Sequence, residues 1–136
     1  MRVSAKVDYA LRALIELASA PTPPVTRDQL AGAQSIPPKF LESILLELRR
    51  AGLVSSRRGS EGGYRLARPA DEISVADVIR AVEGPIATIR GVRPEDVEYA
   101  GSATALRDVW IELRTAIRGV LEQRTLADLV SRDDGA

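Results

Sequence analysis

The fold of this chain is decided by residues 36–66, which read IPPKFLESILLELRRAGLVSSRRGSEGGYRL. The first half has apolar residues at helical spacing between Pro38, which suits a first helical turn, and Gly52, which suits a C-terminal stop. The buried stripe expected for this helix is Leu41, Ile44, Leu45, Leu48 and Ala51. Residues 53–66 then change period, because a short strand at each end encloses the glycine-rich turn 57–62. The stretch therefore predicts a helix followed by a small hairpin with a cationic turn.

Two further helices are predicted on the N-terminal side. Apolar residues at helical spacing predict an amphipathic helix over residues 4–20, with Ser4 as its N-cap. Prolines within residues 21–24 break this helix. Thr26 and Gln29 have the spacing of a capping box, which opens a short helix ending near Gln34. The order is therefore helix, helix, turn, helix and hairpin.

The C-terminal half is predicted to be helical as well. Ser74 caps a helix that ends at Gly84, and a loop over residues 85–101 follows. The longest helical pattern then covers residues 103–123, before a short helix after Thr125 and a polar tail. Its apolar seam repeats in alternating steps of four and three, as in a coiled coil: Leu106, Trp110, Leu113, Ile117 and Val120.

Composition excludes several classes of function. The 136 residues include neither cysteine nor histidine, which removes thiolate nucleophiles, zinc fingers and cysteine-held iron–sulfur clusters. No apolar run is long enough to span a bilayer, so no membrane partner is expected. The 19 basic and 19 acidic side chains cancel, but residues 1–68 carry a formal +5 and residues 69–136 a formal −5. This asymmetry favours a nucleic-acid-binding half joined to a half with another task.

The element order is that of a winged helix-turn-helix, in which the third helix enters the major groove and the hairpin reaches the flanking backbone. A phosphate or guanine edge suits a lysine near the helix start, and the cytosine amino group suits a glutamate. The candidate DNA contacts are Lys39, Glu42 and Ser43 on the helix, Arg57, Arg58, Gly59 and Ser60 on the hairpin, and Lys6 and Tyr9 on the first helix.

Each candidate also has a simpler interpretation. The paired arginines of the hairpin fit a solvated turn, and Lys39 with Glu42 fits an exposed i,i+3 pair. Lys6 and Tyr9 fit packing or solvation instead of backbone contact. Trp110 fits an interface anchor or, alternatively, the wall of a ligand pocket.

Four motifs make the chain similar to one family. They are SAKVDYALRAL (residues 4–14), IPPKFLE (36–42), AGLVSSRRGSEGGYRL (51–66) and ISVADVIRAVEG (73–84). In this order and spacing they resemble the Rrf-type family of bacterial winged-helix transcription regulators, the group of IscR, NsrR and CymR. The resemblance implies a homodimer that binds a partly palindromic, double-stranded operator in the cytoplasm, usually as a repressor. It also implies that the long helix at 103–123 is a dimerisation helix.

One departure from the family concerns its sensor. Many members carry three cysteines between the fourth helix and the long helix, where they hold an iron–sulfur cluster, whereas this chain has no cysteine. A cysteine-free member without a cofactor is therefore expected, and any effector is an unknown small molecule or protein. The signal, the operator and the choice between repression and activation are not specified by the residues.

The predicted fold class is mainly α: a winged helix-turn-helix domain with a small β-hairpin wing plus a long C-terminal dimerisation helix. Residues 1–84 are assigned to DNA binding, 85–102 to a linker and sensor loop, and 103–136 to the dimerisation helix and tail. A winged-helix module that binds protein instead of DNA is the alternative, and a salt-dependent affinity for duplex DNA separates the two. A small enzyme is disfavoured because histidine, cysteine and a convincing carboxylate pair are lacking.

Overall fold

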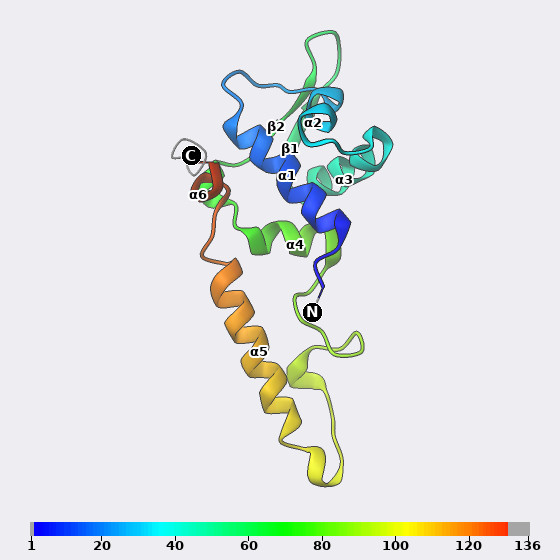
Figure 1. Ribbon diagram of the computed structural model, residues 1–136, viewed down its shortest axis with the longest axis vertical. Coiled ribbons are helices and arrows are strands. Elements are labelled where there is room, and N and C mark those ends of the chain that lie inside the picture. Colours follow the sequence, from blue (N-terminus) through cyan, green and yellow to red (C-terminus); the bar gives the residue numbers. More distant parts are fainter. Residues whose placement is uncertain (1, 131–136) are drawn as a thin grey trace.

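The computed structural model describes residues 2–130 and consists mainly of helices with one two-stranded hairpin (Figure 1). The polar tail predicted after residue 130 lies outside the described residues. The main elements are α1 (Ala5–Ser19), α2 (Arg27–Gln34), α3 (Pro38–Arg50), β1 (Val54–Arg57), β2 (Gly63–Leu66), α4 (Val75–Glu83), α5 (Leu106–Leu121) and α6 (Leu126–Val130). Single 3₁₀ turns occur at Ala70–Glu72, Pro94–Asp96 and Gly101–Ala103. The predicted winged helix-turn-helix is confirmed.

Local signals in the sequence set the ends of the first three helices. The Ser4 side chain accepts a hydrogen bond from the backbone N–H of Val7 and caps α1. Thr26 and Gln29 form the predicted reciprocal capping box of α2. Pro38 occupies the first turn of α3, where its missing N–H costs no hydrogen bond.

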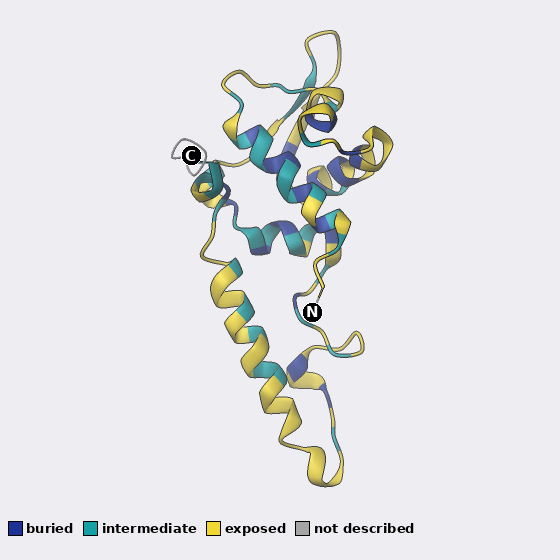
Figure 2. Ribbon diagram, viewed as in Figure 1, coloured by how far each residue is buried: buried dark blue, intermediate teal, exposed yellow. Residues whose placement is uncertain are grey.

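The core lies where α1, α2 and α3 meet, closed by β1 and α4. Leu14, Leu41, Ile44 and Leu48 are all fully buried, and Figure 2 shows the buried segments gathered in this upper part of the molecule. Ala51, predicted to belong to the stripe of α3, is exposed instead. The reason is that α3 ends at Arg50 and the chain turns away through Gly52, whose φ is +79°.

The hairpin is antiparallel, with Val54 opposite Leu66 and Arg57 opposite Gly63. A third segment that the sequence did not reveal supports it. The backbone of Val25, just before α2, exchanges two hydrogen bonds with Tyr64, at 2.9 and 2.7 Å. The wing is therefore attached to the start of the helix-turn-helix.

Helix α5 projects away from this core, and the 3₁₀ turn at 94–96 packs against it (Figure 1). It begins at Leu106, three residues later than predicted, after the 3₁₀ turn at 101–103. No residue of α5 is buried. Beyond it, Leu126 of α6 is fully buried, and its backbone N–H donates to the carbonyl of Ile73 at 3.0 Å. Within residues 2–130, no helix is both long and apolar enough to cross a membrane.

Candidate nucleic-acid interface

The outer face of α3 presents the predicted reading residues to solvent. Lys39, Glu42 and Ser43 are all exposed, because the buried stripe occupies the opposite side of the helix. Between this face and the wing runs a groove of about 530 Å³. It is lined by Lys39, Glu42, Ser43, Leu45, Leu46, Arg49 and Tyr64. Helix and wing thus share one continuous surface.

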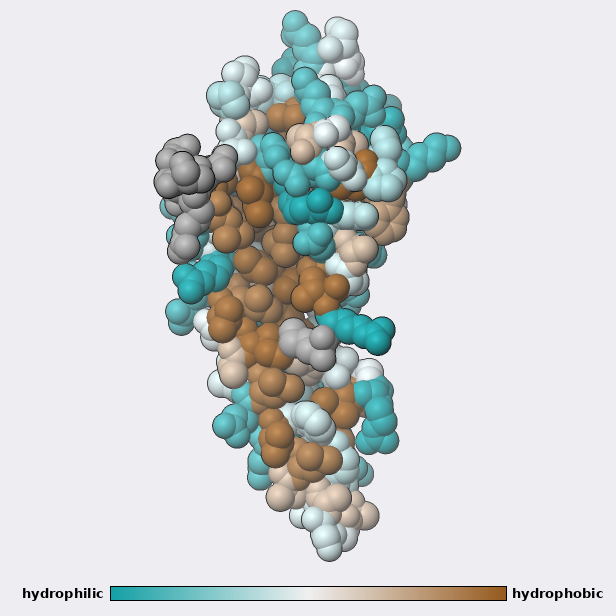
Figure 3. All heavy atoms as spheres, viewed as in Figure 1, coloured by the Kyte–Doolittle hydropathy of each residue, from teal (hydrophilic) through white to brown (hydrophobic). Residues whose placement is uncertain are grey.

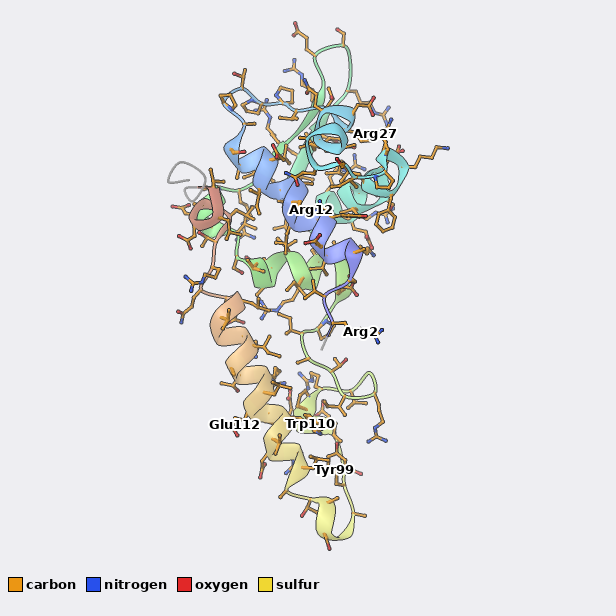
Figure 4. The ribbon with its side chains drawn as sticks, in the orientation of Figure 1. Arg2, Arg12, Arg27, Tyr99, Trp110 and Glu112 are labelled. Carbon is orange, nitrogen blue, oxygen red and sulfur yellow. The ribbon has the colours of Figure 1, made fainter. Side chains whose placement is uncertain are left out.

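Glu42 does not pair with Lys39; its partner is Arg27 of α2. The two charged groups lie 2.8 Å apart, and Arg27 also contacts Asp28 at 3.2 Å. The hydrogen bond with Asp28, followed by the charges of Asp28 and Glu42, raises the pKa of Arg27 above its ordinary value. Figure 4 shows Arg27 on the side of the molecule that carries α2 and α3. The sequence interpretation missed Arg27, although its place directly after the N-cap of α2 could have indicated exposure on this face.

The Ser43 hydroxyl already donates one hydrogen bond within its own helix. It donates to the carbonyl oxygen of Phe40 at 2.8 Å, which leaves the hydroxyl oxygen free to accept. Lys39 has no hydrogen bond or ion pair within residues 2–130, and its ammonium is therefore available to an anion.

The wing carries two free cations beside a strained turn. Arg57 and Arg58 are exposed, and neither guanidinium forms a hydrogen bond or ion pair in the part of the chain that the structure describes. Gly59 has a φ of +108°, in the region that favours glycine. At Gly62 an added Cβ would lie 2.1 Å from the carbonyl oxygen of Arg57. The exposed Ser60 completes a short, cationic loop that only glycines can close in this way.

The wing is also tied to α3 by a side-chain contact. Arg49 donates from Nη1 to the hydroxyl of Ser56 at 3.1 Å. Because Ser56 lies in β1, this bond fixes the spacing between the reading helix and the cationic turn. Arg49 was not among the predicted site residues.

Lys6 and Tyr9 lie on α1 and contact α3. The ammonium of Lys6 lies 2.8 Å from the Glu47 carboxylate, which neutralises much of its charge. The Tyr9 ring packs edge-on against Phe40, with 5.6 Å between centroids, and the Arg12 guanidinium lies 4.8 Å from the centre of the Tyr9 ring. These contacts favour the packing interpretation for both residues, and their contact with DNA stays a prediction.

The five seam residues of α5 and the neighbouring Val109 differ in exposure. Leu106, Val109, Leu113 and Val120 are 39%, 51%, 44% and 59% exposed. Figure 3 shows an apolar face that extends from α1 across α4 and down α5. Trp110 and Ile117 are half-buried and, together with the more exposed Leu113, line a pocket of about 380 Å³ toward α4 and the N-terminus. Trp110 Nε1 donates to the hydroxyl of Tyr99 at 2.9 Å, and Figure 4 shows the two residues close together.

The charged side chains of the loop between α4 and α5 are all arginines, aspartates or glutamates. Two of its three acidic residues are engaged: Asp96 lies 3.0 Å from Arg93, and Glu95 contacts both Arg93 and Arg114. Among residues 2–130, no three His, Cys, Asp or Glu side chains are grouped so that they could hold a metal ion. Thiolates are the ligands that iron–sulfur clusters require, and the chain has none. The residues present do not fit such a cluster.

Comparisons with known proteins agree with this geometry. The model of the Rrf2 family, described as iron-dependent transcriptional regulators, matches residues 3–132. Rv1287 of Mycobacterium tuberculosis, classed among the HTH-type transcriptional regulators, is 54% identical over 130 residues, covering 95% of this chain and 81% of that protein. The solved structure of CymR, the global cysteine regulator of Bacillus subtilis, has a TM-score of 0.82 at 36% identity and covers 96% of this chain and 97% of that one. IscR of T. potens has a TM-score of 0.78 at 34% identity, with 96% and 87% covered.

Proposed function

Because this chain belongs to the Rrf2 family and is a DNA-binding transcriptional regulator of the helix-turn-helix type, we propose that it acts as a homodimeric repressor on a partly palindromic operator. The observation that carries this proposal is the combination of one exposed reading surface and one exposed apolar seam in a single chain. Such a regulator works in the cytoplasm, where a bacterial chromosome lies, and the proposal assigns it no enzymatic activity.

We assign separate tasks to the helix and the wing. Lys39, Glu42 and Ser43 face the base edges of the major groove, where Glu42 can accept from a cytosine amino group. Arg57 and Arg58 meet the flanking phosphates or a narrow minor groove, supported by the backbone of Gly59 and Ser60.

Arg27 adds a positioning role to this surface. Its ion pair with Glu42 holds the carboxylate over α3 and cancels its charge, which lowers its repulsion of the DNA backbone. Both side chains are exposed, so the pair is weak and can exchange for contacts with a base or phosphate.

The exposed apolar residues of α5 form the surface at which a second copy of the chain binds. Leu106, Val109, Leu113 and Val120 follow one another in steps of three, four and seven, which is the heptad spacing of a helix pair. We therefore place these residues at the twofold interface, whereas Trp110 and Ile117 face their own chain and support the helix from behind. Two reading surfaces about one DNA turn apart, roughly 34 Å, would then match two half-sites.

The regulator is proposed to work without an iron–sulfur cluster. The family is described as iron-dependent, but the loop at 85–101 contains neither cysteine nor histidine. Two of its carboxylates, Glu95 and Asp96, are paired with arginines instead of being grouped around an open site. Operator affinity is therefore expected to be independent of iron and of iron chelators.

The test is binding to fragments selected from the chromosome of the source organism. Wild-type protein should retard a palindromic fragment as two chains per duplex, with an affinity that falls steeply with salt. An affinity equal for all duplexes would contradict the sequence-specific part of the proposal, and failure to bind duplex DNA at low ionic strength would contradict all of it.

A further inference from the structure

Four arginines converge on a small pocket between α4, the loop that follows it and α5. Arg80 comes from α4, Arg93 from the loop, and Arg114 and Arg118 from successive turns of α5. The pocket has a volume of about 280 Å³ and is lined by Arg80, Pro85, Ile86, Arg93, Glu95, Arg114 and Arg118. We propose that it binds a small oxyanion of the sulfate or phosphate type.

The charge of the pocket favours an anion. Its lining has four guanidinium groups and one carboxylate, which gives a formal charge of +3. Two carboxylates at its edge, Asp96 beside Arg93 and Glu122 beside Arg80 and Arg118, reduce the local charge to +1. The pKa of Glu122 is lowered by hydrogen bonds from Arg80 and Arg118, so these groups stay charged at neutral pH. The excess of positive charge therefore persists after all neighbouring carboxylates are counted.

The supply of hydrogen-bond donors exceeds the acceptors nearby. Four guanidiniums carry about twenty N–H donors. Among the described residues, only four hydrogen bonds use them, and all four go to Glu95, Asp96 or Glu122. The Nε atom of Arg114 is buried and has no acceptor in the described part of the chain. A tetrahedral oxyanion would supply acceptors to several guanidiniums at once, and the guanidinium fork matches its geometry.

The size and the lining of the pocket suit a small ligand. Its volume lies just below the roughly 300–1,000 Å³ typical of small-molecule pockets. Ile86 is buried and provides an apolar floor, and the Arg114 side chain is only 18% exposed. A partly dehydrated floor strengthens the attraction between guanidiniums and an anion.

The position of the pocket would make binding regulatory, an extension that rests on the proposed function. An anion held by Arg80 and either arginine of α5 ties the DNA-binding domain to the seam helix. Gly84 and Pro85 begin the connection between them, which runs over residues 84–105, and Gly84 has a φ of +89°. Closure there would change the orientation of each α3 relative to the twofold axis and therefore the operator affinity.

Anion binding is tested without DNA by titration calorimetry of the full chain with sodium sulfate and, separately, sodium phosphate. Sodium chloride at equal ionic strength is the reference. We expect saturable binding of at least one oxyanion, and the lower of the two dissociation constants identifies the preferred anion. Arg114→Gln and Arg118→Gln should each weaken it by about tenfold or more, because each removes a charge-assisted hydrogen bond. Arg107→Gln, on the same helix and outside this pocket, should leave it unchanged.

A variant that is expected to tighten oxyanion binding distinguishes an effect on the site from damage to the fold. Glu95→Gln removes the carboxylate that competes for Arg114, and it should tighten oxyanion binding by roughly threefold or more. Damage to the fold could not produce this gain. Absence of saturable binding to wild type, or equal binding by the Arg114, Arg118 and Arg107 variants, would overturn the site. Oxyanion binding that leaves operator affinity unchanged would overturn its regulatory role, and absence of DNA binding in any buffer would count against the proposed function alone.

Discussion

Replacing Leu113 with glutamate should separate the proposed homodimer into folded monomers. Leu113 is 44% exposed in the single chain, so close to half of its surface remains for a partner to cover. Burial of a whole leucine stabilises by about 1.5–3 kcal/mol, so this fraction contributes about 1 kcal/mol in each chain. Each residue occurs twice in a twofold interface, so burial of Leu113 contributes about 2 kcal/mol to the stability of the dimer. Two unpaired carboxylates in an apolar seam add a desolvation cost of at least ~2 kcal/mol.

The sum, about 4 kcal/mol, corresponds to a dimer dissociation constant about 10³-fold higher. Sedimentation equilibrium across a concentration series measures this shift, and circular dichroism verifies that the helices persist. Thr115→Glu is the matched control, because it adds the same charge to an exposed position on another side of α5. If the Leu113 variant sediments as an intact dimer at the wild-type concentration range, the seam does not lie on this stripe.

Arg58→Ala should weaken binding to all duplexes and reduce the slope of log affinity against log salt by about 1.8 per dimer, since each phosphate contact contributes about 0.9; an unchanged slope would remove Arg58 from the phosphate contacts. Glu42→Gln should alter the preferred base at one position per half-site in a selection from random operators, with about 1–3 kcal/mol at stake, whereas the same consensus would refute its reading role. Gly62→Ala should abolish tight operator binding but leave the dimer intact, because the new Cβ would lie 2.1 Å from the Arg57 carbonyl oxygen; wild-type affinity in a gel-shift titration would show that the turn tolerates it. The pKa of Glu122 is lowered by neighbouring guanidiniums, so its ionised form stabilises the fold above its ordinary pKa of 4.5 and this contribution is lost as the pH falls through the lower folded value. The melting temperature of Glu122→Gln should therefore lie below that of wild type at pH 7 and approach it near pH 3, and a constant difference would contradict the ion pair.

Local signals made most of the fold predictable. The cap at Ser4, the capping box at Thr26 and the proline at the start of α3 each act within one helical turn. The start of each helix can therefore be predicted from neighbouring residues in the sequence. The seam helix was placed correctly except for its first turn. Residues 101–103 form a 3₁₀ turn before it, and no cap in the sequence marks the start at Leu106.

Contacts between distant elements could not be predicted in the same way. The backbone pairing of Val25 with Tyr64 leaves no side-chain pattern, because any residue can supply the N–H and carbonyl groups. The partner of Glu42 could not be read from the sequence either, since spacing within α3 offered Lys39 as an alternative to DNA contact and the folded chain brings Arg27 closer. The arginine pocket likewise collects side chains from three segments that are far apart in the sequence.

The most direct test of the central claim is hydroxyl-radical footprinting of the selected operator, combined with the number of chains bound per duplex. A homodimer that presents α3 and its wing twice predicts two chains per duplex and two symmetric protected regions centred about one DNA turn apart, roughly 34 Å. One chain on one protected region, with no symmetry in the bound sequence, would contradict it.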